Sequence, residues 1–181
     1  VGAFHQARVG ELLLAQNQPR DALAAFRAAI APDPTSLAAT RGLSRAALLA
    51  KDPDAARSAA MRERDVTGDL RAAVGVLLRA AHLRLDAGQV DEAARDYETA
   101  IGLDPDSRQA ASGLRATLSR PDQAPQLIDL LSRAALACHD ASHSAALHLS
   151  VAELQAESKG DLAAAVVSAQ RALEKAPDDL G

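Results

Sequence analysis

Aromatic residues and cysteine are scarce in this sequence, and each scarcity excludes a class of protein. The 181 residues include no tryptophan, one tyrosine, two phenylalanines and one cysteine. β-Sheets draw on aromatic and β-branched side chains, so a strand-based architecture is poorly provided for. The single thiol, Cys138, excludes an intrachain disulfide framework. A sheet protein and a disulfide-stapled domain are therefore both disfavoured.

Strong charge and long apolar runs are also missing. The net charge is −4 and the isoelectric point is about 5.7, which argues against a nucleic-acid-binding surface. A membrane span needs about 18 uninterrupted apolar residues, and the richest run, 127–137, contains Asp129 and Arg133. We therefore expect a soluble segment that neither inserts into a membrane nor binds nucleic acid. Cytoplasm and periplasm both remain open as its compartment.

Alanine, leucine and arginine are abundant. The 44 alanines and 26 leucines are strong helix formers, and a hydrophobic content of 48% suits a folded core rather than a disordered chain. Arginine outnumbers lysine 17 to 3, a bias that hints at a bacterial source. The composition predicts an all-helical protein.

Three segments of the chain repeat one pattern. Each has an alanine, an aromatic or small residue four positions later, an alanine three positions after that, and a proline five positions further on. This spacing marks one face of a helix that ends before a proline. The segments are 22–36, 93–107 and 165–179, and their prolines are Pro34, Pro105 and Pro177.

These segments resemble the second helix of the tetratricopeptide repeat (TPR), a unit of about 34 residues that forms two antiparallel helices. Val9 and Gly10 match the large-small pair of the family's first helix, and Leu13 follows at the expected distance. The resemblance implies an all-α, right-handed superhelical solenoid of antiparallel helix pairs, which forms a single domain over 1–181. Its five units are expected near 3–36, 37–70, 71–107, 108–141 and 142–179. The turns inside the units are expected at Asn17, Lys51, Gly88, Asp122 and Gly160.

Two places depart from a regular repeat. The apolar pattern that starts at Leu70 predicts that the first helix of unit three begins about one turn early, and Arg84 occupies a position in it that is normally apolar. The final segment, 176–181, resembles the start of a further first helix. We therefore expect the natural protein to continue beyond Gly181.

The chain offers little catalytic or metal-binding chemistry. Cys138, His139, His143 and His148 lie close together in sequence, and thiolate with imidazole suits zinc. Their spacing matches no zinc pattern, and 138–144 is predicted to be a polar linker between units four and five. Motifs for phosphate loops, nucleophile elbows and zinc-protease helices are also missing. We therefore predict no cofactor, no metal site and no enzyme activity.

The resemblance also implies where a partner would bind. TPR solenoids are similar in that their first helices line a groove that holds a segment of a partner protein. Because arginine grips carboxylates in a bidentate fork and leucine anchors apolar side chains, the expected partner is an acidic or amphipathic segment. The predicted groove residues are Arg41, Arg45, Leu48, Leu49, Arg79, His82, Leu85 and Arg120.

Two functions remain open at this stage. The first is a protein-interaction scaffold, an adaptor in a larger bacterial assembly for envelope biogenesis, export or secretion. The alternative is a structural spacer or a segment that self-associates through the ends of the solenoid. A helical repeat that binds nucleic acid is disfavoured by the negative charge and the few stacking aromatics.

Overall fold

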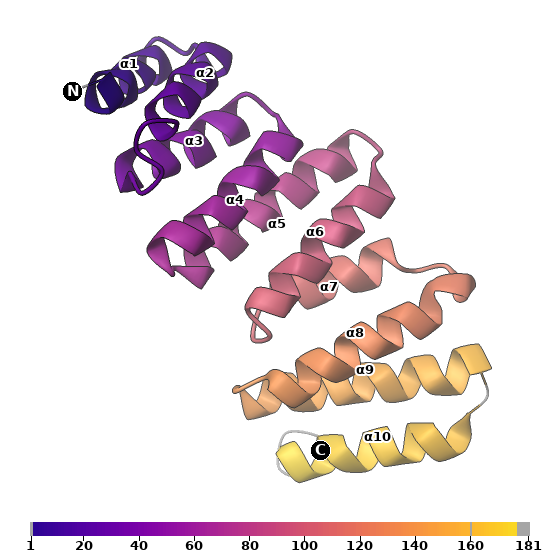
Figure 1. The fold of residues 1–181 in the computed structure, drawn as a ribbon. Coiled ribbons are helices and arrows are strands. Elements are labelled where there is room, and N and C mark those ends of the chain that lie inside the picture. Colours follow the sequence, from indigo (N-terminus) through magenta and orange to yellow (C-terminus); the bar gives the residue numbers. More distant parts are fainter. Residues whose placement is uncertain (1, 160, 177–181) are drawn as a thin grey trace. The chain divides into compact units, whose positions relative to one another are not determined.

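A computed structural model describes residues 2–159 and 161–176, and within these ranges helices joined by short turns and linkers make up the chain (Figure 1). The described part contains ten α-helices, one short 3-10 helix and no strand, which confirms the predicted all-α class. The helices are α1 (Gly2–Ala15), α2 (Pro19–Ile30), α3 (Leu37–Leu49), α4 (Pro53–Thr67), α5 (Leu70–Asp86), α6 (Val90–Leu103), α7 (Arg108–Thr117), η1 (Pro121–Gln123), α8 (Ala124–Ala137), α9 (Ala141–Lys159) and α10 (Leu162–Lys175).

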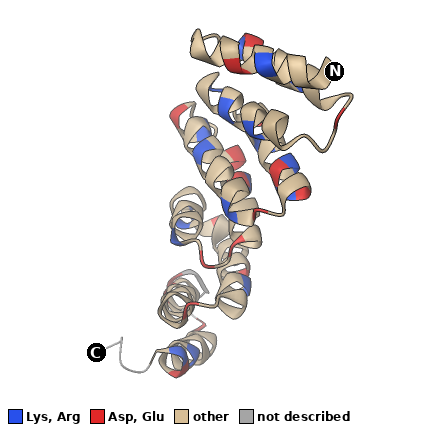
Figure 2. Cartoon of the chain, turned by 90° about the vertical axis from the view of Figure 1, so that its left-hand side faces the viewer, with Lys and Arg blue, Asp and Glu red and all other residues tan. Residues whose placement is uncertain are grey.

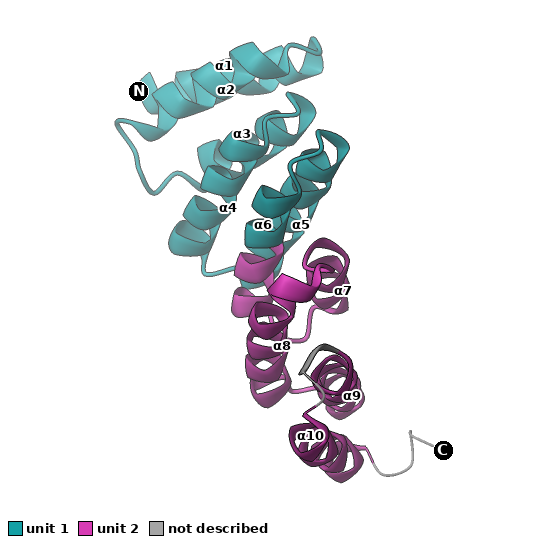
Figure 3. Ribbon diagram, turned by 90° about the vertical axis from the view of Figure 1, so that its right-hand side faces the viewer, with its two compact units in different colours: residues 1–96 teal, residues 97–181 magenta. Residues whose placement is uncertain are grey.

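The helices follow one another as antiparallel neighbours within two compact units, residues 1–96 and 97–181 (Figure 3). In the first unit α1 packs on α2, α2 on α3, α3 on α4 and α4 on α5. In the second unit α8 packs on α9 and α9 on α10. The boundary between the two units falls inside α6. Each unit is therefore a stack of helix pairs, as the repeat pattern predicts.

Side-chain caps and prolines explain where many of these helices begin. Asp52, Asp69 and Asp161 each accept a hydrogen bond from the backbone N–H three residues later, at 2.9–3.0 Å. Such caps satisfy a donor that the first helical turn leaves unpaired. Pro19 and Pro53 occupy the first helical position, where a missing N–H costs nothing. Because Asp69 caps α5, this helix starts at Leu70 and runs for 17 residues, the early start that the sequence predicts.

The turns inside the helix pairs are not all alike. Asn17, Lys51 and Gly88 adopt left-handed backbone conformations, with φ of 57°, 54° and 74°. The turn predicted at Asp122 is instead the 3-10 helix η1, which follows the shortest of the described α-helices, α7. The expected turn at Gly160 and the proline Pro177 lie outside the described residues.

Alanine and glycine set the spacing of the helices around the few aromatic side chains. Phe26 is completely buried, and its ring lies against the backbone of Gly10 on α1 and of Gly42 on α3. A Cβ atom at Gly10 would approach the ring to 2.7 Å, closer than real contacts allow, and one at Gly42 would come closer still. Tyr97 lies in the same way against Gly113 of α7. These glycines are therefore required by close packing.

A buried polar network connects α4, α5 and the first half of α6. Arg84, only 6% exposed, donates to Asp96 at 2.8 Å and to Asp54 at 2.7 Å. Arg57 donates a second hydrogen bond to Asp96. Burial opposes the charge of Arg84, but the hydrogen bonds to Asp54 and Asp96 outweigh it and hold the pKa of Arg84 above its ordinary value. The arginine at a normally apolar position is thus accommodated by two carboxylates.

In the part of the chain that the structure describes, no helix combines the length and the apolar character that a membrane crossing requires.

Candidate partner-binding clefts

The first cleft lies in unit 1–96, between α3 and α5, the first helices of successive pairs. Its volume is about 320 Å³. The second helix of the intervening pair, α4, contributes a single residue to its wall. The lining residues are Arg41, Ser44, Arg45, Leu48, Glu63, Ala72, Gly75, Val76 and Arg79.

Three arginines surround this α3–α5 cleft, and they differ in how they are held. Arg45 forms a bidentate pair with Glu11 of α1, with N–O distances of 3.2 and 3.3 Å. Arg41 lies 3.9 Å from Glu63, a loose ion pair. Arg79 is exposed and donates through Nε to the carbonyl oxygen of Gly75 on its own helix, at 3.1 Å. Arg79 is therefore the cleft arginine best placed to bind a carboxylate of another molecule.

Glu63 is the one carboxylate in the wall of the α3–α5 cleft. It is 5% exposed, and its Oε2 accepts a hydrogen bond from the Ser44 hydroxyl at 2.9 Å. Its other oxygen, Oε1, lies 3.9 Å from Arg41, and as a single negative charge Glu63 offsets only one of the three arginines. The lining keeps an excess of positive charge, whereas the unit as a whole mixes acidic and basic residues along its helices (Figure 2).

The structure brings together four of the eight predicted groove residues. Arg41, Arg45, Leu48 and Arg79 line the α3–α5 cleft. The other members from unit 1–96 lie outside its lining: Leu49 is 61% exposed at the end of α3, the His82 ring nitrogen Nδ1 contacts the Leu78 carbonyl at 2.7 Å, and Leu85 is half-buried.

Arg120 lines a second cleft, in unit 97–181. This cleft has a volume of about 340 Å³ and lies between α7, the η1 turn, the start of α8 and α9. Arg115 and Glu157 stand on its rim with Arg120, and Arg115 donates to the Ser150 hydroxyl at 2.9 Å. Its apolar lining consists of Leu118, Pro121, Ala124, Leu127 and Leu154. The shortness of α7 and the η1 turn thus create a pocket that the regular repeat does not predict.

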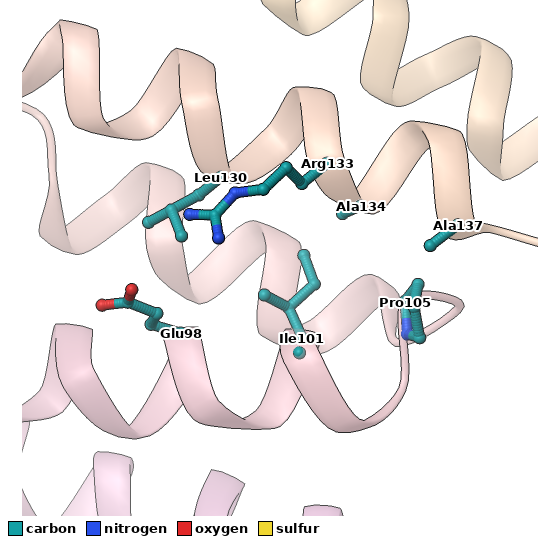
Figure 4. A pocket seen from close by; sticks show the side chains of 8 residues that line it. Glu98, Ile101, Pro105, Leu130, Arg133, Ala134 and Ala137 are labelled. Carbon is teal, nitrogen blue, oxygen red and sulfur yellow. The ribbon is translucent and has the colours of Figure 1, made fainter.

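A third groove runs between the second helices α6 and α8 of unit 97–181 (Figure 4). Its volume is about 270 Å³. Ile101 and Leu130 line it, Pro105 closes one end, and Glu98 and Arg133 project from opposite helices. Arg133 is already paired with Asp129 at 2.7 Å, one helical turn away. This groove has one acidic and one basic lining residue. Unlike the α3–α5 cleft, its charge therefore does not indicate which kind of ligand it would bind.

The linker between α8 and α9 is shorter than predicted. The sequence places it at 138–144, but Asp140 accepts a hydrogen bond from the His143 backbone at 3.1 Å and so lets α9 begin at Ala141. His143 and His148 are therefore helical and buried, at 6% and 2% exposure. In the residues that the structure describes, no group of three or more His, Cys, Asp and Glu side chains is arranged to hold a metal ion.

Asp106 fixes this linker. Its carboxylate accepts hydrogen bonds from the Cys138 thiol at 2.8 Å and from the backbone of His139 and Asp140 at 2.8 and 3.0 Å. These bonds, the one from Asp140 foremost, hold the pKa of Asp106 well below its usual range. Burial, together with the hydrogen bond to Asp106, raises the pKa of Cys138 to about 12. Such a thiol is almost entirely protonated at neutral pH and is therefore a weak nucleophile.

Sequence reasoning missed the cleft residues that do not come from the exposed face of a first helix. Glu63 belongs to α4, where it follows the buried Ala56 and Ala60 at helical spacing. A lone carboxylate on an otherwise alanine-lined face was a detectable signal. Gly75 and Val76 were missed as lining residues because a sequence does not show which side of α5 is left open.

The chain belongs to the tetratricopeptide-repeat family. The model of this family matches residues 10–74 and 78–114, more than half of the chain. Proteins of this family are generally non-catalytic scaffolds for interactions between proteins, and this class agrees with a structure that offers clefts between helices. No curated protein matches the chain significantly.

Several solved structures are similar to the chain at low sequence identity. The crystal structure of the MamA protein is 15% identical, with a TM-score of 0.49 and coverage of 99% of this chain and 97% of that one. YrrB, described as a TPR protein with an unusual peptide-binding site, is 16% identical, with a TM-score of 0.42 and coverage of 96% and 86%. A thermophilic TPR protein from Thermus thermophilus is 22% identical, with a TM-score of 0.41 and coverage of 98% and 93%. The family assignment rests on the sequence match.

Proposed function

We propose that this protein is a non-catalytic adaptor that binds an acidic, amphipathic segment of a partner protein in the α3–α5 cleft. The observation that carries the proposal is the composition of the cleft: three arginines and one buried carboxylate surround the apolar side chains of Leu48 and Val76. A carboxylate of the partner would pair with Arg79, and a leucine-sized side chain would fill the space above Gly75. Charge-assisted hydrogen bonds to arginine supply the specificity of such sites.

The open space at Gly75 supports this assignment. A Cβ atom at Gly75 would meet nothing within 4 Å, although the residue lies in the wall of the cleft. The helix backbone is thus directly accessible to a ligand at this point. Glycine in the middle of a helix costs about 0.5–1 kcal/mol relative to alanine. The open backbone at Gly75 therefore comes at the expense of some helix stability.

The test begins with a random peptide library displayed on phage and selected on the purified protein. We expect enrichment of peptides in which leucines at helical spacing alternate with glutamate or aspartate. A labelled peptide from this selection is then titrated by fluorescence polarisation. Arg79→Glu should weaken its binding about tenfold or more, because a hydrogen bond to a charged group contributes about 1.5–3 kcal/mol.

A substitution that fills the cleft provides the sharper control. Gly75→Leu should abolish peptide binding while circular dichroism shows a helix content equal to that of the wild type. Gly102→Leu is the matched control, because Gly102 is also helical, also has nothing within 4 Å of its Cβ position, and lies in the α6–α8 groove. Enrichment of basic peptides, or equal binding by wild type and Gly75→Leu, would overturn the proposal.

The wider setting that we propose is an adaptor in a bacterial assembly of envelope biogenesis, export or secretion. Its support is the family resemblance together with the arginine-rich composition. Affinity capture from bacterial cells with wild-type protein and with Arg41→Glu/Arg45→Glu as bait, followed by mass spectrometry, tests it. A partner of such an assembly that only the wild type captures is the expected result, and captured proteins that are identical for both baits contradict it.

A further inference from the structure

A basic cavity lies in unit 1–96, between α2 and the turn that joins α3 to α4. Its volume is about 440 Å³, within the range of about 300–1,000 Å³ that is typical of small-molecule sites. Arg20, Arg27 and Lys51 stand in its wall, and Leu23 and Ala24 form the wall between the two arginines. The cavity shares no lining residue with the α3–α5 cleft.

The three basic side chains reach the cavity from two sides. Arg20 and Arg27 are seven residues apart on α2, about two helical turns, so they lie on one face of that helix. Lys51 comes from the turn opposite. All three residues are exposed, and none of their side chains forms an ion pair or a hydrogen bond with another described residue. Their charges are therefore available to an anion in the cavity.

The charge of the wall suits a doubly charged anion. Among the described residues that line the cavity, Asp52 is the one carboxylate. It is already engaged, because it accepts the hydrogen bond from the Ala55 backbone that caps α4, at 2.9 Å. The wall thus keeps an excess of two positive charges. A phosphate monoester carries a charge of about −1.5 to −2 at neutral pH and offers three acceptor oxygens, whereas a carboxylate carries a single negative charge.

Lys51 has a backbone conformation that lysine rarely adopts. Its φ is 54°, and Asn17 and Gly88 have the same left-handed conformation in the turns of the neighbouring helix pairs. Glycine takes this conformation without strain and asparagine is enriched in it, whereas a longer side chain is disfavoured. Lysine is therefore a poor choice for the turn itself, although it brings a positive charge to the cavity.

We propose that the cavity between α2 and the α3–α4 turn binds a phosphate monoester. Arg20 and Arg27 donate hydrogen bonds to the phosphate oxygens from α2, and the Lys51 ammonium group donates from the turn. Hydrogen bonds between these cations and phosphate are of the strong, charge-assisted kind. The organic part of the ester lies against the apolar wall of Leu23 and Ala24. This ligand and the partner segment in the α3–α5 cleft occupy different sites.

An NMR titration of the isotope-labelled protein with phenyl phosphate, at constant ionic strength, tests the proposal. The backbone amide signals of Leu23 and Lys51 should shift until they saturate, and benzoate, which carries a carboxylate on the same ring, should bind more weakly. Arg20→Glu should weaken phenyl phosphate binding about tenfold or more, because it removes a charge-assisted hydrogen bond and adds a repulsive charge.

Arg71→Glu is the matched control for Arg20→Glu. Arg71 is also exposed and is also the second residue of its helix, but it lies outside the cavity. Glutamate is favourable in a first helical turn, so both variants should remain folded. Arg71→Glu should bind phenyl phosphate as the wild type does, and equal losses in the two variants would refute the site.

Lys51→Gly separates the binding role of the lysine from its place in the turn. It should weaken phenyl phosphate binding about fivefold. It should also raise the urea midpoint of unfolding, because glycine adopts the left-handed conformation without strain. A variant that is more stable and binds phenyl phosphate as well as the wild type would contradict the proposal.

Vesicles show whether the ester is a soluble molecule or a lipid headgroup. Phosphatidic acid carries a phosphate monoester, and phosphatidylglycerol, a diester, is the control lipid. Binding of phenyl phosphate or of phosphatidic acid vesicles that is lost in Arg20→Glu supports the proposal, and the probe that binds more tightly identifies the source. Binding of neither probe, or benzoate binding as tight as that of phenyl phosphate, rules the proposal out.

Discussion

Arg84 and Asp96 form an ion pair inside unit 1–96, with Nε and Oδ2 separated by 2.8 Å and both side chains less than a tenth exposed. The pair lies twelve residues apart in sequence, on α5 and α6. Because Asp96 also accepts from Arg57, it is the acceptor that two arginines share. Removing the Asp96 carboxylate therefore leaves the buried guanidinium of Arg84 without its buried partner.

We expect Asp96→Ala to lower the free energy of unfolding by about 3–5 kcal/mol, the cost of leaving a buried charge without its partner. Replacing both members, as in Arg84→Met/Asp96→Leu, should cost much less, because apolar side chains of similar volume often substitute for a buried pair without loss. Urea denaturation measures the free energy of unfolding of the wild type and of both variants.

The control for the buried pair is Asp54→Ala, which removes the second partner of Arg84. Asp54 is 86% exposed, so its loss should cost less than about 1 kcal/mol. An Asp96→Ala variant as stable as Asp54→Ala would show that the buried pair contributes nothing.

Cys138 should react slowly with thiol reagents. Its pKa of about 12 leaves almost no thiolate at pH 8. We expect the native protein to react with iodoacetamide at least tenfold more slowly than the urea-unfolded protein, in which the thiol regains an ordinary pKa. Asp106→Asn removes the facing charge and should accelerate the native reaction. A native rate equal to the unfolded one would contradict the hydrogen bond between Cys138 and Asp106.

Mild acid should destabilise the protein through its buried histidines. Burial lowers the pKa of His148, the positive charges of Arg171 and Lys175 lower it further, and Glu174 opposes them. Burial likewise lowers the pKa of His143. The unfolded state then binds protons that the folded state does not, so stability is greatest above the unfolded pKa of about 6.5 and falls as the pH drops below it.

The urea midpoint should therefore be lower at pH 5.5 than at pH 7.5. His148→Leu removes one of the two groups and should reduce this difference. A midpoint that is the same at both pH values in the wild type would show that neither histidine resists protonation in the folded state.

Glycines of α3 and α5 should respond in opposite ways to a methyl group. Gly42→Ala drives a Cβ atom into the ring of Phe26 and should cost about 1–3 kcal/mol, the usual effect of overpacking. Gly75→Ala meets no atom and should stabilise the helix by about 0.5–1 kcal/mol. Thermal or urea unfolding of the two variants tests this contrast. Equal effects at both sites would contradict the close approach of Phe26 to Gly42.

The sequence could predict those features that depend on neighbouring residues. Pro19, Pro53 and the aspartate caps mark helix starts locally, and the apolar periodicity of 70–85 correctly extends α5 toward its N-terminus. The sequence places Arg41, Arg45 and Arg79 on the exposed face of the first helices through the family resemblance, and all three line one cleft; that they bind a partner stays a prediction. Such features need no knowledge of distant contacts.

The remainder depends on contacts between residues far apart in the chain. Asp106 holds a linker 32 to 34 residues away, and no local pattern shows this contact. The same limit applies to Arg45, which pairs with Glu11, 34 residues earlier. From the sequence alone Arg45 would be expected to be unpaired on an exposed helix face. The start of α9 was misplaced because the polar residues that follow Asp140 looked like loop, whereas Asp140 itself caps the helix.

The position of Phe26 has a consequence for how such a chain gains or loses repeats. Its ring, on the second helix of one pair, is covered on one side by Gly10 of its own pair and on the other by Gly42 of the next. When a complete helix pair is duplicated or deleted, a different first helix therefore comes to pack against the Phe26 ring. The residue of that helix that meets the ring is either a glycine, which fits, or a residue with a Cβ atom, which clashes. Exchange of repeats is compatible with this packing only when the incoming first helix carries a glycine at the place where the ring meets its backbone.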